Sequence, residues 1–219
     1  MRGFLARLAA SRGVESREAK WELYRHAFPP REGERILDVG ASQTDDLPGE
    51  NYFLRRYPHP GQVTAVGVQD MEPLRERYPA VNFVQADGRE LPFADEEFDV
   101  VHSNAVIEHV GPQEDQERFV AELVRVSKAG FVTTPNRWFP IEAHTHLPVF
   151  HWLPRPLATA VMRRDWFVWL LSRRSFAQLF PRDVDFEMHV QRMGGWPATL
   201  IAIFRRRDGS KLTPPDRFA

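Results

Sequence analysis

The sequence contains no cysteine. This absence excludes disulfide bonds, thiolate metal sites and a cysteine nucleophile, and it is compatible with a reducing cytoplasm. Long apolar runs are missing too: no stretch reaches the roughly 18 residues of a membrane-spanning helix. The apolar part of residues 1–8 is too short for a signal peptide. We therefore expect a soluble, cytoplasmic protein.

The sequence also lacks an excess of either charge. Its 29 Lys and Arg residues balance 30 Asp and Glu residues, which leaves a net charge of −1. Without a basic footprint we expect no nucleic-acid partner. The hydrophobic fraction of 42% and the charged fraction of 27% are ordinary for a globular protein. At roughly 100–200 residues per domain, the length of 219 residues predicts one domain with an elaboration.

Residues 35–44 predict a strand and a turn that bind a ligand. Ile36, Leu37 and Val39 form a near-continuous apolar run, which is typical of parallel strands covered by helices on both faces. Gly40 then allows a turn where a side chain would clash. In open α/β folds, ligands bind at this carboxyl edge of the sheet.

The turn is poor in glycine, which narrows the choice of ligand. A dinucleotide fingerprint has three glycines, so a nicotinamide oxidoreductase is excluded on spacing. Ala41 and Ser42 keep the turn thin enough for a ligand to lie against the main chain. Asp38 places a carboxylate at the strand end, where it suits a cationic group such as the amino-acid end of S-adenosylmethionine (SAM). An ordinary buried strand and turn is the alternative.

The stretch resembles motif I of the class I SAM-dependent methyltransferases, acid-x-Gly-x-Gly-x-Gly, with Ser42 and Thr44 in place of the later glycines. After a second predicted strand, residues 63–68, a doubly wound fold has an acid that binds the ribose hydroxyls. Gln69 occupies that position and Asp70 follows it. Either side chain can serve, and Asp70 can instead cap the next helix.

The segments downstream match the same family in type and order. A third predicted strand, residues 81–86, is followed directly by Asp87 and Gly88. The resemblance implies that Asp87 accepts a hydrogen bond from the adenine amino group and that the neighbouring main chain contacts the ring. Leu91-Pro-Phe93 and the predicted strand at residues 98–104 then complete the pattern.

The resemblance implies an α/β fold: a Rossmann-like three-layer sandwich with a seven-stranded, mostly parallel sheet. Alternating apolar residues at 184–190 and an apolar return at 198–204 predict its antiparallel C-terminal pair. We expect helices within residues 1–30, in two pieces, to cover the ligand site. A helical lid or insertion is expected at about residues 137–175.

The segment after the fourth strand resembles the Glu-His-Val motif of small-molecule methyltransferases of the type 11 family. By this likeness Asn104 contacts the cofactor, Glu108 contacts the acceptor and His109 takes part in catalysis. Ala105 stands where some relatives have a metal-binding Glu, so we expect no metal. A helix start in which Glu108 caps main-chain amides and His109 packs is an equal alternative.

The loop at residues 135–148 borders the acceptor pocket in the resembling family. His144 and His146 are two residues apart, so an extended chain points them the same way. Either can take a proton from an acceptor hydroxyl; binding a metal or bonding loop carbonyls are the alternatives. Arg137 and Trp138 are candidate acceptor contacts, and Arg137 can equally tie down the loop.

Residues 149–171 are rich in aromatic side chains punctuated by prolines and arginines. This composition fits a lid over an apolar acceptor, a peripheral contact with a membrane surface, extra core or a homodimer contact. The sequence does not decide between a monomer and a homodimer.

The leading hypothesis is a SAM-dependent methyltransferase that acts on a small or lipid-like molecule, with oxygen as the favoured acceptor atom. The Asn-Pro-Pro-aromatic motif of enzymes that methylate amide and nucleobase nitrogen is absent after the fourth strand. The alternative is a non-catalytic SAM-binding partner or scaffold protein. Ser42, Thr44 and Gln69 motivate it because each departs from the family pattern at a cofactor contact.

Overall fold

The computed structural model describes residues 2–46, 49–142, 148–153, 156–157, 168–182 and 184–207, with the backbone alone for residues 2–12. One seven-stranded sheet has the order β3-β2-β1-β4-β5-β7-β6. The strands are β1 (Ile36–Val39), β2 (Val63–Gly67), β3 (Asn82–Gln85), β4 (Phe98–Asn104), β5 (Ser127–Pro135), β6 (Val184–Met193) and β7 (Trp196–Arg206). Strands β1 to β5 are parallel, and β7 is antiparallel to β5 and β6. The predicted fold class is confirmed.

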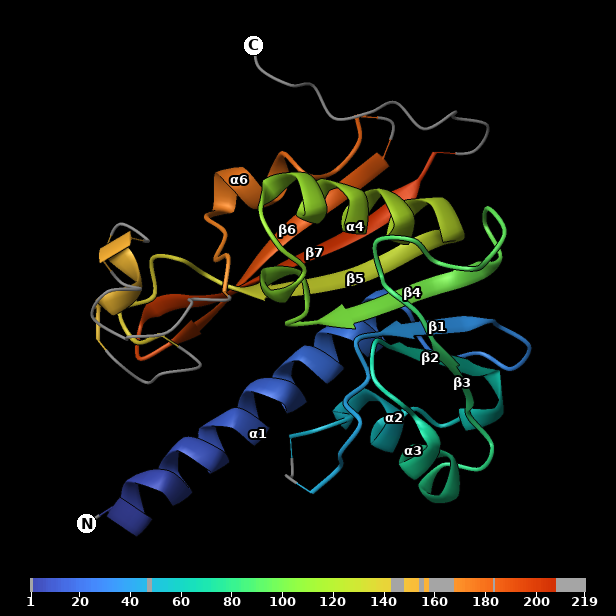
Figure 1. Cartoon of the computed structure of the whole chain (residues 1–219), viewed down its shortest axis with the longest axis horizontal. Helices are drawn as coiled ribbons and strands as arrows, with labels where there is room; N and C mark the ends of the chain where they lie inside the picture. The colour runs from blue at the N-terminus through green and yellow to red at the C-terminus, as the bar shows by residue number, and fades with distance from the viewer. Residues whose placement is uncertain are drawn as a thin grey trace.

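Helices cover both faces of this sheet (Figure 1). The α-helices are α1 (Arg2–Ala27), α2 (Tyr52–Arg56), α3 (Glu72–Arg77), α4 (Gln113–Val126) and α6 (Arg173–Ala177). The 3-10 turns are η1 (Pro60–Gln62), η2 (Ile107–His109) and η3 (Phe150–Trp152). Helices α1, α2 and α3 lie on one face, and α4 and α6 on the other. The two N-terminal pieces expected from the sequence are one helix, α1, which Pro29 and Pro30 follow.

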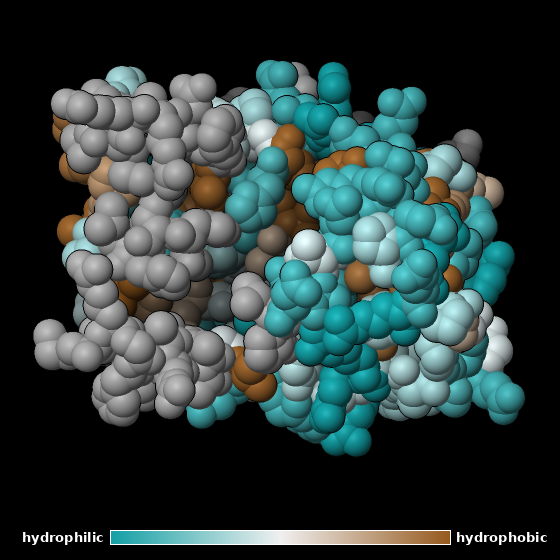
Figure 2. Space-filling view, turned by 60° about the horizontal axis from the view of Figure 1, so that its bottom comes forward, coloured by the Kyte–Doolittle hydropathy of each residue, from teal (hydrophilic) through white to brown (hydrophobic). Residues whose placement is uncertain are grey.

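Two apolar cores result, one on each face of the sheet. Trp21 and Tyr24 of α1 pack with Phe53 of α2 against one face. Phe119 and Leu123 of α4 pack against the other. These α4 residues are four apart in the chain and share one face of the helix, while charged residues occupy the opposite face. Hydrophilic side chains cover much of the outer surface in Figure 2, with hydrophobic ones visible in the hollow at its middle.

The sheet order places a topological switch between β1 and β4. The chain runs outward from β1 to β2 and β3, then crosses back to β4 on the other side of β1. The carboxyl ends of β1 and β4 therefore meet where doubly wound folds bind their ligands. Among the residues that the structure describes, none of the helices has the length and apolar character of a membrane span. Residues 143–147, 154–155 and 158–167 of the predicted insertion at about 137–175 lie outside those residues. The described remainder contains η3 and the start of α6.

Candidate functional site

Asp38 and His102 form a buried pair at the switch point. They are register partners on the adjacent strands β1 and β4, and Nδ1 of His102 donates to Oδ1 of Asp38 at 2.7 Å. Phe53 stacks on the imidazole, with a centroid distance of 4.1 Å and an interplanar angle of 12°. These contacts fix the carboxylate, and its other oxygen accepts no hydrogen bond from the described residues.

The turn after β1 requires Gly40. Its φ of 103° lies in the left-handed region, and a Cβ there would stand 2.1 Å from Cγ2 of Val106. The amides of Gly40 and Ala41 both donate to the carbonyl of Val66, at 2.8 and 3.0 Å. The chain thus turns sharply after the strand, as the sequence predicts, and the structure shows that it stays close to β2.

Asn51 braces the loop in which the expected glycines are missing. Its Oδ1 accepts from the amide of Ser42 at 2.9 Å, and its Nδ2 donates to the carbonyls of Ser42 and Thr44 at 3.1 and 2.9 Å. Asn51 itself has φ 45°, a conformation that asparagine tolerates well. The Asn51 side chain therefore holds the main chain at Ser42 and Thr44, the two positions where motif I has glycine.

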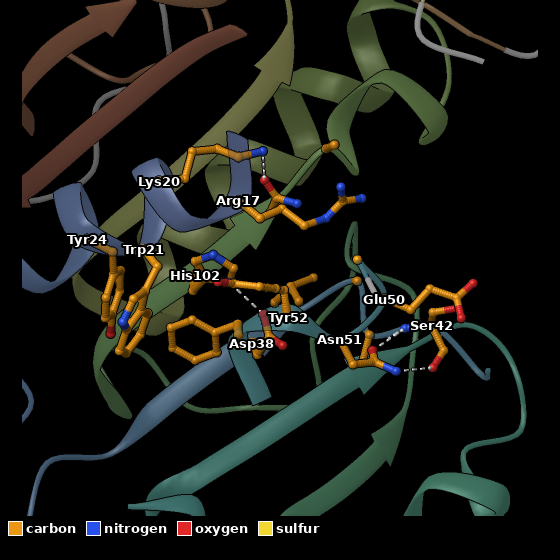
Figure 3. A pocket seen from close by; sticks show the side chains of 17 residues that line it. Arg17, Lys20, Trp21, Tyr24, Asp38, Ser42, Glu50, Asn51, Tyr52 and His102 are labelled. Atoms are coloured by element: carbon orange, nitrogen blue, oxygen red, sulfur yellow. Dashed lines mark hydrogen bonds and ion pairs between the residues drawn. The ribbon is translucent and has the colours of Figure 1, made fainter. Parts of the chain in front are cut away.

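A cavity of about 300 Å³ opens between α1 and the carboxyl ends of β1 and β4. Figure 3 shows Arg17 and Lys20 reaching in from α1, opposite Asp38, Ser42 and Asn51. The Nη1 atom of Arg17 donates to the carbonyl of Gly13, whereas its buried Nε has no hydrogen-bond partner in the described part of the chain. Burial lowers the pKa of Arg17. An unsatisfied guanidinium N–H at a cavity wall is suited to bind an anionic group.

Lys20 lies in the same wall, and its Nζ donates to Oδ1 of Asn104 at 2.6 Å. Oδ1 also accepts from Oγ1 of Thr133 at 2.8 Å, which holds the amide in place. Burial lowers the pKa of Lys20 to about 8, with a further contribution from the charge of Arg17, while Glu108 opposes this shift. The amine is therefore mostly protonated at pH 7 and about half neutral near pH 8.

A second cavity, of about 190 Å³, shares a wall with the first. Arg17, Lys20, Asn104 and Ala105 border both. Its far side is formed by residues that include Glu142 and His151, both buried. His151 is 8% exposed; its Nε2 donates to the carbonyl of Arg137 at 2.8 Å, and its Nδ1 has no partner among the described residues. With Nε2 protonated, Nδ1 offers a lone pair to a ligand.

A groove of about 540 Å³ adjoins the second cavity. Ser16, Phe139, Ile141, Met193 and Ala198 border both spaces. Farther out, the wall includes Pro140 and Trp196. Ile141 and Trp196 are 47% and 56% exposed, so this groove presents apolar surface to solvent beside a polar cavity.

Comparison with known proteins shows which proteins this chain is similar to. The family model for the methyltransferase domain matches residues 49–132. A probable S-adenosylmethionine-dependent methyltransferase of Mycobacterium tuberculosis is 46% identical over 67 residues, 29% of this chain and 23% of that protein. The phthiotriol/phenolphthiotriol dimycocerosates methyltransferase of M. tuberculosis is 34% identical over 102 residues, 45% of this chain and 35% of that protein. The chain thus matches about a third or less of the length of these relatives.

A solved structure extends the likeness to the fold. The 1,6-didemethyltoxoflavin-N1-methyltransferase of Burkholderia thailandensis, solved with 1,6-didemethyltoxoflavin and S-adenosylhomocysteine, aligns with a TM-score of 0.56. The alignment covers 90% of this chain and 79% of that one at 19% identity. Over residues 49–132 this chain matches the methyltransferase domain, and the relatives that it matches are SAM-dependent methyltransferases by name. The resemblance predicted from motif I and from the order of the later segments is confirmed.

The structure brings five of the predicted cofactor residues to one cavity. Asp38, Gly40, Ala41, Ser42 and Asn104 all border the 300 Å³ space. Their contact with the cofactor stays a prediction, which their convergence supports.

The other predicted cofactor residues do not border that cavity. Gln69 is exposed, and Oδ1 of Asp70 accepts from the amide of Glu72 at 3.0 Å, in line with the capping alternative. Asp87 binds the guanidinium of Arg89, which lowers the pKa of that carboxyl. A Cβ on Gly88 would stand 2.5 Å from the Phe119 ring, so this glycine lets α4 pack closely.

The predicted acceptor and catalytic residues are dispersed. Glu108 is fully buried, and Oγ1 of Thr134 donates to its Oε2 at 3.1 Å. His109, in the same turn, is exposed. Arg137 and Trp138 are exposed and in cation–π contact, and neither borders the three spaces described above. His144 and His146 lie outside the described residues. No group of three metal-binding side chains was found within the described ranges.

Sequence reasoning missed Arg17, Lys20, His102 and His151. A signal existed for the first two: Arg17, Lys20 and Tyr24 have the spacing of one helix face. His102 lies within the predicted strand at residues 98–104, yet its pairing with Asp38 depends on strand register. His151 carried no local signal, because its role depends on a loop folding back towards α1.

Proposed function

We propose that this chain transfers a methyl group from SAM to a hydroxyl group of a lipid-like molecule. The observation that carries the proposal is the wall, including Lys20 and Asn104, that two cavities share. Methyl transfer requires a donor and an acceptor held in contact and in line. Two adjoining cavities offer each reactant a site of its own.

The residues of the larger cavity suit the charged end of SAM. The free Nε of Arg17 can donate to the carboxylate of the methionine part. The second oxygen of Asp38, which the His102 contact leaves available, can accept from its ammonium group. Gly40 borders the same cavity and has no side chain that would obstruct a ligand. When bound, SAM supplies an activated methyl group, and the protein's task is to orient the reactants and exclude water.

The second cavity and its groove suit an amphipathic acceptor. The cavity offers polar partners in Lys20 and His151, and the adjoining groove offers apolar surface around Ile141 and Trp196. A molecule with a hydroxylated head and an apolar tail matches this division. The M. tuberculosis relative is named for phthiotriol and phenolphthiotriol dimycocerosates, hydroxyl-bearing by the suffix triol. This agreement favours oxygen as the acceptor atom.

Calorimetric titration tests the cofactor half of the proposal. Purified protein, stripped of cofactor, is titrated with SAM and separately with S-adenosylhomocysteine. We expect saturable binding of both ligands at one site. If well-folded protein bound neither, the proposal would fail, and the departures at Ser42 and Thr44 would mark the loss of the cofactor site.

Methyl transfer to matched probes tests the acceptor half. Phenol is compared with para-nonylphenol, and propanediol with dodecanediol, by transfer of labelled methyl from SAM. We expect the longer member of each pair to have the higher kcat/KM, and Trp196→Ser to reduce that preference. Exposed Trp138, which does not border the groove, supplies the control Trp138→Ser. SAM binding without transfer to any probe would favour the non-catalytic partner or scaffold.

A further inference from the structure

Lys20 is placed where the two cavities meet. It extends from α1 beside the cofactor cavity (Figure 3), and it also borders the second cavity. A group at this boundary can reach a reacting atom that passes between the two spaces. Asn104, at the end of β4, borders both spaces as well and fixes the amine through a 2.6 Å hydrogen bond.

The partner of Lys20 is a neutral amide. In the described part of the chain, no carboxylate forms an ion pair with its Nζ, whereas Lys128 pairs with Asp99 at 2.7 Å. A partly buried ammonium without a carboxylate partner is poorly compensated. A neutral amine, by contrast, keeps its N–H bond to Asn104 and retains a lone pair for another ligand. The pKa of about 8 that burial causes agrees with this geometry.

We propose that Lys20 is the general base, whose Nζ takes the proton of an acceptor hydroxyl bound in the second cavity. This inference rests on the proposed function and adds the group that activates the acceptor. His151 has a different part: its free Nδ1 accepts a hydrogen bond from a second donor group on the acceptor and fixes the orientation of the head.

The reaction balances without any further reagent. The acceptor O–H bond breaks, its proton adds to the Nζ lone pair, and the freed electron pair on oxygen bonds the methyl carbon. The methyl–sulfur bond breaks with its electron pair staying on sulfur. Positive charge therefore passes from the sulfonium to the Lys20 ammonium, which later releases the proton to solvent. The products are a methyl ether and S-adenosylhomocysteine.

Charged groups from several elements surround Lys20 and set the pH range of this step. Arg17, on α1, and the sulfonium of bound SAM both disfavour a second positive charge, whereas Glu108 favours it. The other titratable groups in the walls of the two cavities include Asp38, Glu50, His102, Glu142 and His151. A rate limited by Lys20 rises with pH and levels off above about pH 8.

Trace acetylation tests the protonation of Lys20 without an acceptor. The sequence has three lysines, Lys20, Lys128 and Lys211, so mass spectrometry can follow each with acetic anhydride from about pH 6.5 to 10.5, with S-adenosylhomocysteine present. We expect Lys20 to be half-reactive near pH 8, about two units below the ordinary lysine value. Reaction in the ordinary range, or no reaction at any pH, would overturn the proposal.

Variants then separate base catalysis from positioning. Lys20→Arg keeps a positive charge and a donor for Asn104 but cannot release its proton at these pH values; Lys20→Met removes both. With para-nonylphenol as acceptor we expect both to lower kcat by about 100-fold or more and to abolish the pH-dependent rise, while the SAM affinity stays within about twofold. Lys128→Arg, at an exposed surface pair, should behave as wild type.

Each other result of the variant experiment counts against Lys20. A Lys20→Arg variant with near-wild-type kcat shows that a positive donor suffices. If Lys20→Met weakens SAM binding and Lys20→Arg does not, the residue binds the carboxylate of the cofactor. Loss of the pH-dependent rise in His151→Gln alone makes His151 the base. Failure of wild type to bind SAM refutes the proposed function, whereas acetylation reports on Lys20 independently.

Discussion

Asp38 and His102 hold each other at the meeting point of β1 and β4, with 2.7 Å between Oδ1 and Nδ1. They are register partners on neighbouring parallel strands, and Phe53 stacks on the imidazole. The strand-end acid of motif I is therefore held from inside the protein through one oxygen. Its other oxygen stays available to a ligand in the cavity. The sheet therefore fixes the orientation of this carboxylate before any ligand binds.

Replacing Asp38 by asparagine should weaken SAM binding more than the same change at Asp87. Asp38 borders the cavity, whereas Asp87 is engaged by Arg89 outside it. Loss of one charged hydrogen bond predicts a decrease in affinity of about 10- to 100-fold for Asp38→Asn, measured by calorimetry. Asp99→Asn, at the other end of β4, is the control. An equal loss of SAM affinity in Asp87→Asn would support the predicted contact of Asp87 with adenine. The cofactor site would then have to extend to the end of β3.

Gly40→Ala should destabilise the fold as well as the cofactor site. The substitution combines the strain of φ 103° with a Cβ that would stand 2.1 Å from Val106. We expect the two effects together to lower the free energy of unfolding by about 2–5 kcal/mol, measured by urea denaturation. Gly33→Ala has a similar φ of 87° but open space around the new Cβ, so it isolates the strain. Val106→Ala should recover part of the loss in Gly40→Ala. Equal destabilisation at Gly33 and Gly40 would refute the close contact.

Arg17→Met should weaken SAM binding through the methionine carboxylate. The free Nε of Arg17 and its place in the cavity wall predict a loss of about tenfold or more. Decarboxylated SAM should bind wild type and variant alike, because it lacks the group that Arg17 would contact. Arg25→Met is the matched control, since Arg25 lies on the same helix in an exposed pair with Glu22. If decarboxylated SAM lost as much affinity as SAM, Arg17 would serve another part of the cavity.

The sheet was predictable from the sequence because its signals are local. Buried parallel strands such as Ile36–Val39 are apolar runs, and the final pair alternates, so periodicity identifies both. The turn at Gly40 was also predictable, because glycine directly after a buried strand permits a backbone conformation that other residues rarely adopt. The single helix α1 was not, because its apolar spacing is interrupted near Gly13.

The acceptor side was less predictable, because it is assembled from distant segments. Lys20, Glu142 and His151 come together only when the chain after β5 folds back towards α1. The sequence pattern led us to predict His144 and His146 as candidate bases. In the structure, however, the buried imidazole whose Nδ1 has no partner among the described residues is that of His151. Likewise, the exposed Arg137 and Trp138 matched a motif, whereas Arg17 matched none and borders both cavities.

The lowered pKa of Lys20 predicts a stability that rises with pH. The folded state holds the pKa at about 8, whereas the unfolded chain has a lysine value of about 10.4. Between these values the unfolded chain binds the extra proton, so raising the pH favours the folded state. Urea denaturation should show this rise between about pH 8 and 9.5 in wild type and a smaller rise in Lys20→Met, with Lys128→Met as control.

The measurement has to stop near pH 9.5, because tyrosines act in the opposite direction above it. Burial raises the pKa of Tyr57 to about 12, so the unfolded chain loses that proton first, from about pH 10, and stability then falls. At pH 7, Lys20 is protonated in both states, and the folded state carries the cost of a poorly paired ammonium. Lys20→Met should therefore be at least as stable as wild type at pH 7. A marked loss of stability there would mean that the ammonium is well satisfied and that Lys20 is unsuited to act as a base.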